Sequence, residues 1–347
     1  MTIAFYISGH GFGHASRSIE VINALVDRQP DARIVIRSEV APWLVARTVR
    51  PGVTLEPVAC DTGVVQIDSL TLDDTATLAR ARAFIATFPA RVDHEVAWLT
   101  RVGATHVVAD LPPLGIAAAH AAGLPAIALG NFTWDWIYAG YAGSDDLVSL
   151  IGEIYSRTTL ALRLPMWGGF ATIPRVTDMP MVARRSSRDP MAVRDALRLP
   201  RDQRLVLASF GGYGVNGFHV AAIRQVPGYR VLLPGDLDEA AMYEQGLRYE
   251  DLVHAVDVVV TKPGYGIISE CVANHTALLY TSRGHFVEYD VLVEAMPRYL
   301  RTAFIDHADL FAGRWATHLD ALLAQPAPPE QPATNGADVA ARLITET

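Results

Sequence analysis

The chain has 347 residues and a formal net charge of −8, from 37 acidic and 29 basic side chains. Half of its residues are hydrophobic, which is enough apolar material for two compact domains and argues against a disordered protein. The acidic balance and the absence of a long basic run exclude a typical nucleic-acid-binding protein.

The cysteines and the apolar segments indicate a cytoplasmic protein. The sequence contains only Cys60 and Cys271, which we expect to be reduced thiols because a chain of this size does not depend on disulfides. The first residues read as a strand and lack the pattern of a signal peptide. The most apolar long stretch, 114–130, contains Gly123 and Pro125, which predict a helix followed by a strand and no transmembrane segment.

The first half of the chain alternates short apolar runs with helical patterns. Continuous apolar strands that alternate with helices predict a parallel sheet covered on both faces. The predicted strands are 2–8, 33–37, 53–58, 106–109 and 126–129, and the predicted helices are 16–26, 72–101, 114–122 and 146–163.

The alternation of apolar strands and helices resumes after an irregular stretch rich in Pro, Arg and Ser, 165–190. We expect this stretch to end the first domain and form a hinge. Predicted strands 204–209, 230–233 and 256–261, with a helix at 219–225, indicate a second and smaller Rossmann-like domain. The tail 325–335 has four prolines and resembles a linker. The expected domains are 1–180 and 181–325, followed by a linker and a C-terminal helix in 326–347 that docks back on the body.

The first strand runs into a glycine-rich turn, Gly9-His10-Gly11-Phe12-Gly13-His14. Its glycines allow a sharp turn and a close approach of a ligand to the backbone, and the next helix points free N–H groups into the same space. The spacing lacks the G-x-G-x-x-G register of a dinucleotide-binding turn, so NAD binding is disfavoured.

Two histidines of this turn, His10 and His14, are candidates for a general base, because imidazole titrates near neutrality and can take a proton from an attacking hydroxyl. The alternative is that they cap the helix or bind backbone carbonyls. Their i, i+4 spacing also suits a metal, but the sequence offers no evident third ligand.

A second turn connects the apolar run 258–261 to a helix through Lys262, Pro263 and Gly264. The free amides of the first helical turn suit a diphosphate. Glu270 lies one and a half turns into that helix, where its carboxylate could accept two hydrogen bonds from a ribose diol. The alternative is an ordinary strand-to-helix turn with Glu270 favourably placed near the helix dipole.

Asp110 ends a predicted buried strand, and ligands of parallel sheets gather beyond such carboxyl ends. We therefore expect Asp110 to face a cleft and orient acceptor hydroxyls. Trp134, Asp135 and Trp136 combine flat apolar faces with a carboxylate, which suits stacking on a sugar, although both tryptophans could instead fill the core.

One metal-like motif, Asp236-Leu237-Asp238, resembles the DxD signature of metal-dependent glycosyltransferases of another fold. It follows Leu233-Pro234-Gly235, so we interpret it as a turn and a helix cap.

Four segments in this order resemble GT-B glycosyltransferases: GHGFGH, NFTWDWIY, TKPGYGIISE and HFVEYDVL. The resemblance is tightest to the glycosyltransferase-like N-terminal region of plant L-arabinokinases, and it extends to the bacterial UDP-N-acetylglucosamine transferase of peptidoglycan synthesis. It implies an α/β chain of the GT-B fold, two Rossmann-like domains with parallel sheets facing a central cleft. The first domain would bind the acceptor and the second the nucleotide sugar.

The implied activity is transfer of a sugar from a nucleoside diphosphate sugar, UDP-linked in the closest families, to a hydroxyl of a small-molecule or lipid acceptor. The nucleotide sugar is a co-substrate, and no cofactor or metal is implied, because helix amides stabilise the leaving group. The absence of the His-Gln pair of the peptidoglycan enzyme leaves the donor sugar open. A sugar-nucleotide epimerase or hydrolase on the same fold and a non-catalytic sugar-nucleotide-binding protein remain alternatives, because fold does not fix chemistry.

The resemblance also implies roles for individual residues. His14 would lie where the catalytic or oxyanion-binding histidine of the acceptor side lies, with His10 beside it. Asp110, chosen from its place at the end of a strand, is the third expected catalytic residue. The remaining expected site residues bind substrate: Gly11, Gly13, Asn131, Trp134, Asp135, Gly211, Gly212, Gly214, Tyr249, Lys262, Gly264, Tyr265, Gly266, Ser269, Glu270, His285, Phe286 and Glu288.

Overall fold

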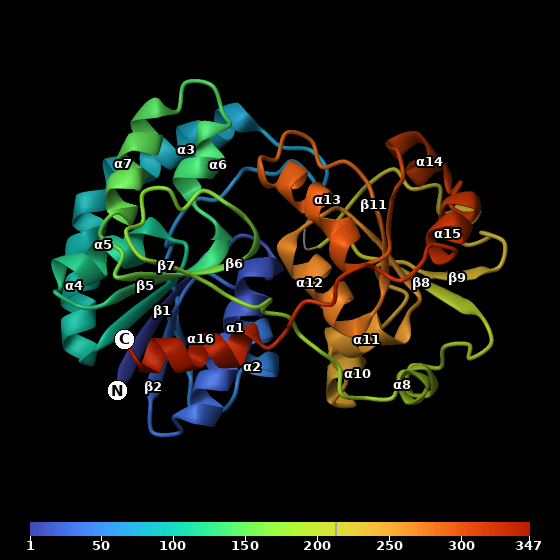
Figure 1. Cartoon of the computed structure of the whole chain (residues 1–347), viewed down its shortest axis with the longest axis horizontal. Helices are drawn as coiled ribbons and strands as arrows, with labels where there is room; N and C mark the ends of the chain where they lie inside the picture. Colours follow the sequence, from blue (N-terminus) through green and yellow to red (C-terminus); the bar gives the residue numbers. More distant parts are fainter. Residues whose placement is uncertain (212–213) are drawn as a thin grey trace.

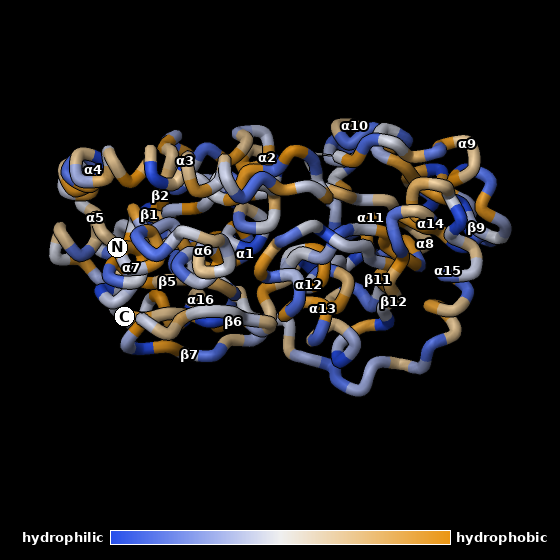
Figure 2. The backbone as a smooth tube through the Cα atoms, turned by 90° about the horizontal axis from the view of Figure 1, so that it is seen from above, coloured by the Kyte–Doolittle hydropathy of each residue, from blue (hydrophilic) through white to orange (hydrophobic). Residues whose placement is uncertain are grey.

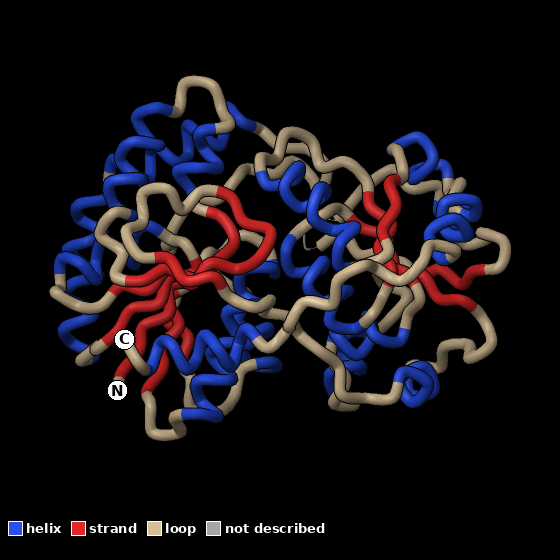
Figure 3. The backbone as a smooth tube through the Cα atoms, viewed as in Figure 1, coloured by secondary structure: helices blue, strands red, loops and turns tan. Residues whose placement is uncertain are grey.

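The protein consists of two α/β lobes that lie side by side (Figure 1). It is described here as a computed structural model, which covers residues 1–211 and 214–347. Each lobe has its own parallel sheet, with helices packed around the strands (Figure 3). The predicted α/β class, with two Rossmann-like domains, is confirmed.

The N-terminal lobe contains a seven-stranded sheet in the order β3-β2-β1-β4-β5-β6-β7. All neighbouring pairs are parallel, and the register places Ile7 of β1 opposite Asp110 of β4. The strands are β1 (Thr2–Ile7), β2 (Arg33–Arg37), β3 (Thr54–Glu56), β4 (His106–Asp110), β5 (Ala126–Phe132), β6 (Leu160–Gly168) and β7 (Val176–Asp178). The helices are α1 (Phe12–Arg28), α2 (Pro42–Thr48), α3 (Asp74–Ala86), α4 (Phe88–Val102), α5 (Pro113–Ala121), α6 (Trp134–Ala139) and α7 (Asp145–Tyr155).

The C-terminal lobe contains a five-stranded parallel sheet in the order β12-β11-β10-β8-β9. Its strands are β8 (Arg204–Ala208), β9 (Tyr229–Leu232), β10 (Val258–Thr261), β11 (Ala277–Tyr280) and β12 (Thr302–Phe304). The helices from α8 onward are α8 (Pro190–Ala196), α9 (Val220–Ile223), α10 (Glu239–Glu244), α11 (Tyr249–Ala255), α12 (Tyr265–Asn274), α13 (Glu288–Tyr299), α14 (His307–Ala312), α15 (Ala316–Leu323) and α16 (Gly336–Thr345).

Two predicted helices are different in the structure. The helix expected at 72–101 is broken into α3 and α4, because Pro89 occupies the first turn of a new helix and cannot donate to a preceding one. The helix expected at 146–163 ends at Tyr155, and residues 160–163 of the expected range instead form the start of strand β6. Leu160, Leu162 and Leu164 are buried in β6, and a strand satisfies this alternate spacing.

The chain passes between the lobes twice (Figure 1). The first passage follows β7, and the second returns before α16, which packs on α1 of the N-terminal lobe. Val182 and Asn335 pair where the two passages meet, and Gly336 has no room for a side chain because an added Cβ would lie 2.4 Å from the Pro180 carbonyl oxygen. The two lobes are therefore held by two adjacent connections.

The lobes also contact each other through helices at the junction. Figure 2 shows α12 and α13 of the C-terminal lobe next to α1 and β6 of the N-terminal lobe. A third contact comes from the loop after β3, where Leu70 joins the apolar core of the C-terminal lobe and Ser69 Oγ donates to the Phe210 carbonyl at 2.6 Å. In the part of the chain that the structure describes, no helix is long and apolar enough to cross a bilayer.

Candidate active site

Two helix N-termini meet at the junction of the lobes. Helix α1 begins after Gly11, whose φ of 74° favours glycine, and α12 begins after Gly264. Among the residues that the structure describes, neither helix has a side-chain cap, so the amides of both first turns lack that partner. A Cβ added to Gly266 would lie 3.4 Å from the Cα of Gly13, so the two turns face each other at close range. Such a pair of helix starts favours a negatively charged ligand.

His14 pairs with Asp110 on the N-terminal side of this junction. The imidazole Nδ1 lies 2.8 Å from Asp110 Oδ1, and the His14 side chain is 13% exposed while Asp110 is fully buried. Arg17 Nη2 also lies 3.0 Å from this Nδ1. Because the guanidinium already donates to Asp110 and a carboxylate can only accept, we assign the Nδ1 proton to the hydrogen bond with Asp110, which leaves the Nε2 lone pair free. A histidine held in this tautomer by a carboxylate can act as a general base.

The Asp110 carboxylate is saturated by protein donors. Arg17 donates to both oxygens, from Nε at 2.7 Å and from Nη2 at 2.5 Å, and Ser18 Oγ donates to Oδ2 at 2.7 Å. Burial alone raises the pKa of Asp110, but the Arg17 charge and hydrogen bonds, aided by His14, hold that pKa well below its usual range. The structure corrects the expected role: Asp110 has no oxygen left for acceptor hydroxyls, and it positions His14.

His10 points to a different part of the N-terminal lobe. Its Nε2 lies 3.2 Å from Asp61 Oδ1, and its ring packs where a side chain on Gly63 would be. Burial lowers the pKa of His10, but the hydrogen bond and charge of Asp61 outweigh this and raise it. Ser8 Oγ also donates to Asp61, at 3.1 Å. The two histidines of the turn therefore have separate carboxylate partners.

A chain of buried polar contacts crosses from one lobe to the other. Arg17 Nη1 donates to Asn131 Oδ1 at 2.7 Å, and Asn131 Nδ2 donates to Glu288 Oε1 at 2.7 Å. Glu288 Oε2 lies 4.0 Å from Arg283 Nη1. Asn131 and Glu288 are both predicted site residues, and the structure brings them into direct contact across the cleft.

The C-terminal side of the junction carries an excess of positive charge. Arg283 is buried, its guanidinium lies 3.8 Å from the centre of the Phe286 ring, and its Nε has no partner among the described residues. Lys262 follows β10 and donates from Nζ to Gln66 Oε1 of the other lobe at 3.0 Å. Burial, together with the charge of Arg283, lowers the pKa of Lys262 to about 7. Both cations lie beside the free first turn of α12.

Glu270 lies on the same helix, but its carboxylate has a protein partner. Arg184, in the first passage between the lobes, donates to Glu270 Oε1 from Nε at 2.7 Å and from Nη2. Burial raises the pKa of Glu270, against the opposing charge of Arg184. The carboxylates of Glu250 and Glu20 lie in the same cluster. Both contacts of Arg184 fall on Oε1, so this arginine fixes one oxygen of the carboxylate.

Three further predicted residues use their hydroxyls within the protein. Tyr265 is buried, and its hydroxyl accepts from the Val182 amide at 3.2 Å. Ser269 Oγ donates to the Gly266 carbonyl at 2.9 Å, and the Tyr249 hydroxyl lies 2.7 Å from Ser209 Oγ. These side chains shape the walls of the junction.

Trp134 and Asp135 diverge at the start of α6. The Trp134 ring is 3% exposed and lies nearly parallel to His14, with the ring centres 6.4 Å apart, so it forms the wall behind the histidine and belongs to the core. Asp135 is not brought to the cleft. Its Oδ2 faces Thr172 at 3.4 Å, because successive helical residues point in different directions.

Two loops of the C-terminal lobe, one with His285 and Phe286 and one with Gly211 and Gly214, contact the N-terminal lobe. His285 is exposed and lies 3.2 Å from Asp74 of α3, and Phe286 lies beneath Arg283. Gly211 has a φ of 75°, and the Gly214 carbonyl accepts from the Ser69 amide at 3.2 Å. Gly212 lies outside the described residues.

Sequence reasoning missed four charged residues that organise the junction, namely Arg17, Asp61, Arg184 and Arg283. Arg17 lies one helical turn after His14, a spacing that places both side chains on one helix face and could have drawn attention to it. The other three lie in loops, where the sequence has no periodicity to orient them.

The metal-like motif is a turn and a helix cap, as predicted. Asp238 caps α10 by accepting from the Ala241 amide, and Asp236 Oδ2 accepts from the Leu233 amide at 2.9 Å. Within residues 1–211 and 214–347, no group of three or more His, Cys, Asp or Glu side chains is arranged to hold a metal ion.

The comparison with solved structures identifies the architecture as the GT-B fold. The chain superimposes on the calicheamicin glycosyltransferase CalG4 with a TM-score of 0.62, covering 99% of this chain and 96% of that one at 16% identity. It is similar to Medicago truncatula UGT71G1 complexed with UDP-glucose, with a TM-score of 0.60, coverage of 99% and 93%, and 11% identity. It is also similar to the glycosyltransferase VinC in complex with dTDP, with a TM-score of 0.55 and 16% identity. That match covers 100% of this chain and 94% of VinC. At these identities the likeness establishes the fold alone.

In sequence, the chain is similar to L-arabinokinase of Arabidopsis thaliana, with 29% identity over 361 residues. The match covers all of this chain and 34% of the plant protein, so the chain spans about a third of the length of that relative. No family model matches the chain. The predicted resemblance to GT-B glycosyltransferases and to plant L-arabinokinases is confirmed.

Proposed function

We propose that the protein transfers a sugar from a nucleoside diphosphate sugar to a hydroxyl of a small-molecule or lipid acceptor. The nucleotide binds mainly to the C-terminal lobe, and the acceptor binds against the N-terminal lobe near His14. We place this reaction in the cytoplasm, a location supported by the two cysteines, which are unpaired and buried.

His14 is the proposed general base. Its Nε2 removes the proton of the acceptor hydroxyl as the oxygen attacks the anomeric carbon of the sugar. The bond between that carbon and the diphosphate oxygen breaks, and both electrons leave with the diphosphate. Asp110 holds the tautomer and stabilises the imidazolium that forms.

The leaving diphosphate is stabilised by the C-terminal side of the junction. Free amides at the start of α12, together with Lys262 and Arg283, supply partial and full positive charges where negative charge develops. This role needs no bound metal, since the protein itself supplies the positive charge.

The observation that carries the proposal is the close approach of the two helix starts, with a Cβ on Gly266 only 3.4 Å from Gly13. It brings a histidine with a carboxylate partner and an anion-binding helix turn to one place. In the proposed reaction the histidine activates the acceptor hydroxyl, and the helix turn stabilises the leaving diphosphate.

Glu270 is the proposed ribose ligand. Arg184 donates twice to Oε1, so Oε2 is the oxygen that we propose accepts from the ribose hydroxyls. Arg184 belongs to the passage between the lobes and holds the carboxylate in place for this role.

A thermal-shift screen followed by a turnover assay tests the proposal. UDP and dTDP sugars are the first donors to screen, because solved GT-B neighbours bind UDP-glucose and dTDP, and UDP-L-arabinose is added because of the relative's name. A nucleotide sugar at a hundred times its Kd stabilises the folded chain by about 2.7 kcal/mol. We expect release of nucleoside diphosphate that depends on a hydroxyl-bearing acceptor. Equal release without acceptor indicates a hydrolase, and binding without turnover across the acceptor panel contradicts the transferase.

A further inference from the structure

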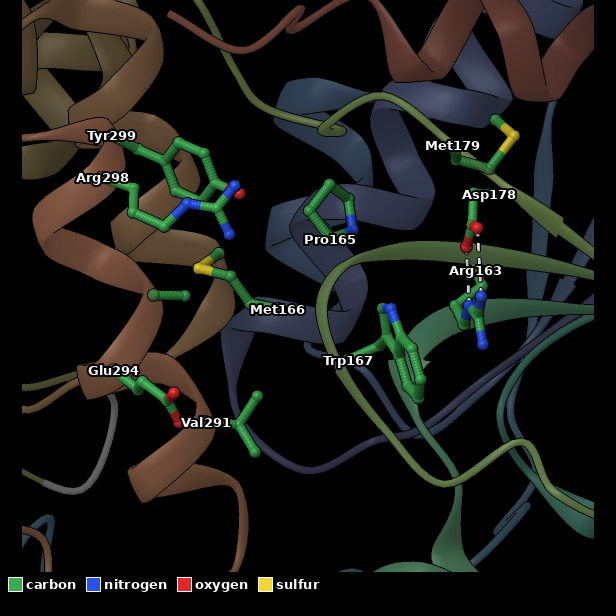
Figure 4. A pocket seen from close by; sticks show the side chains of 11 residues that line it. Arg163, Pro165, Met166, Trp167, Asp178, Met179, Val291, Glu294, Arg298 and Tyr299 are labelled. Atoms are coloured by element: carbon green, nitrogen blue, oxygen red, sulfur yellow. Dashed lines mark hydrogen bonds and ion pairs between the residues drawn. The ribbon is translucent and has the colours of Figure 1, made fainter. Parts of the chain in front are cut away.

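A cavity of about 470 Å³ opens between the lobes, and Met166, whose carbonyl accepts from Asn131, is one of its lining residues. One wall comes from β6 and the end of β7, and the other comes from α13 (Figure 4). Its volume lies in the range that holds a small molecule, about 300–1,000 Å³. None of the predicted site residues lines it.

The two walls present different chemistry. Figure 4 shows the Trp167 ring on the β6 wall, facing Val291 and Glu294 of α13 across the cavity. Trp167 is 45% exposed, which is unusual for so large an apolar side chain. Tyr299 adds a second aromatic ring on the α13 side. Flat apolar faces of this kind stack on the C–H face of a sugar ring.

The charged side chains at the cavity have no positive excess. Arg163 lies over the Trp167 ring at 3.8 Å and is held by two hydrogen bonds to Asp178, at 2.6 and 3.0 Å. Arg298 is likewise held by Glu330, and the exposed Glu294 takes no part in these ion pairs. A lining without excess positive charge disfavours phosphates, while fixed carboxylates and guanidinium groups can bind hydroxyls.

We propose that this cavity is a second binding site for an uncharged carbohydrate ring, which stacks on Trp167 and hydrogen-bonds to Glu294. The site is connected to the catalytic residues through Met166. The Met166 side chain lines the cavity, and its carbonyl accepts from Asn131 Nδ2, at 3.3 Å. Asn131 in turn binds Arg17 and Glu288, so an occupant contacts both lobes next to the buried polar chain.

Direct titration of the full chain tests this site without relying on turnover. Methyl β-D-glucopyranoside, methyl β-D-galactopyranoside and cellobiose serve as uncharged probes, and glucose 6-phosphate serves as the charged comparison. Tryptophan fluorescence and saturation-transfer NMR report binding, for which we expect a Kd of about 1 mM, a free energy near −4 kcal/mol. At least one uncharged probe should bind more tightly than glucose 6-phosphate.

Two substitutions, one from each wall, locate the binding. Trp167→Ala removes the stacking face, and Ala295→Leu fills the cavity from α13 while keeping Trp167; each should weaken binding of the uncharged probe by about tenfold or more. Trp43→Ala is the matched control, since Trp43 is 39% exposed but lies on α2, away from the cavity. UDP affinity should stay unchanged in all three.

Four outcomes overturn the inference. The first three are no binding of any uncharged probe to the wild-type chain, preferential binding of glucose 6-phosphate, and equal binding by the wild type and both cavity variants. Loss of binding in Trp43→Ala alone would place the carbohydrate at another surface and also contradict it.

Discussion

The buried arginines on the two sides of the cleft, Arg17 and Arg283, differ in how far their charges are compensated by protein partners. On the N-terminal side, Arg17 donates to Asp110 and Asn131 and has a fully buried carboxylate as counter-ion. On the C-terminal side, the Nε of Arg283 has no partner within residues 1–211 and 214–347, the carboxylate of Glu288 is 4.0 Å from Nη1, and Lys262 adds a second cation. In the proposed reaction, the first arginine belongs to the unit that orients the base, and the second supplies positive charge to the diphosphate.

Replacement of His14 gives the largest expected effect on activity. His14→Ala should lower turnover by about 10²–10⁴-fold, the usual contribution of a general base, while UDP binding on the other side stays unchanged. The assay is acceptor-dependent release of nucleoside diphosphate. His120→Ala is the control, because His120 is exposed on α5, and this variant should keep wild-type turnover.

Exchange of each arginine for glutamine separates the two sides by stability. Arg17→Gln leaves Asp110 buried without its counter-ion and should lower the free energy of unfolding by about 3–5 kcal/mol. Arg283→Gln removes a poorly compensated buried charge, so it should leave stability unchanged or raise it while weakening UDP binding by about tenfold. Urea denaturation and calorimetric titration measure the pair. A similar loss of stability in both variants would show that Arg17 and Arg283 are equally well compensated by the protein.

The affinity for a nucleotide sugar should depend on the protonation of Lys262. Its pKa of about 7 in the free protein means that the ammonium is charged below pH 7 and neutral above it. A diphosphate favours the charged form, so affinity for UDP-glucose should fall by about tenfold between pH 6.5 and 8.5, roughly one pKa unit of coupling. Lys262→Met should bind weakly at both pH values. An equally steep pH dependence in that variant would assign the titration to another group.

The carboxylate cluster around Arg184 predicts a pH-dependent stability with a defined sign. Burial, assisted by the charge of Glu250 and opposed by Arg184, raises the pKa of Glu20 to about 7. In the folded protein Glu20 therefore keeps its proton up to about pH 7, whereas in the unfolded chain it releases the proton near pH 4.5. The contribution of Glu20 to the free energy of unfolding is fully present below pH 4.5 and is lost as the pH rises to 7.

Glu20→Gln tests that sign by differential scanning calorimetry. The variant and the wild type should have similar thermal midpoints at pH 5, where Glu20 is protonated in the folded state. At pH 8 the variant should melt at the higher temperature. A variant that is less stable than the wild type at pH 8 would mean that the Glu20 carboxylate is stabilising.

A substitution outside the cleft gives the smallest effect and a baseline for the others. Asp238→Ala removes the cap of α10 and should lower the free energy of unfolding by about 1 kcal/mol, the usual value for such a cap. Turnover and its response to added Mn²⁺ should match the wild type. A selective loss of metal-stimulated turnover would restore the metal-binding interpretation of the Asp236-Leu237-Asp238 motif.

The fold was predictable because it depends on residue patterns that are local. Short apolar strands and the two glycine turns identify a pair of parallel sheets and the ends at which ligands gather. The errors came where a local pattern is ambiguous. Leu160, Leu162 and Leu164 follow a helical segment directly, and only their pairing with β5 and β7 makes them a strand.

The site was less predictable, because it depends on which side chains meet across two lobes. His14 and Asp110 could be selected one by one, but their contact follows from the pairing of β1 with β4. The ion pair between Arg184 and Glu270 joins residues 86 positions apart and has no sequence signature. Asp135, a plausible sugar ligand in sequence, is directed to Thr172 by the rotation of α6.

A crystal structure of the protein with UDP bound tests most directly whether the two helix starts form one nucleotide-sugar site. We predict that the diphosphate lies within hydrogen-bonding distance of the first-turn amides of α12, in contact with Lys262 or Arg283, and opposite His14. A diphosphate bound elsewhere, with Lys262 and Arg283 still facing only protein, would contradict it.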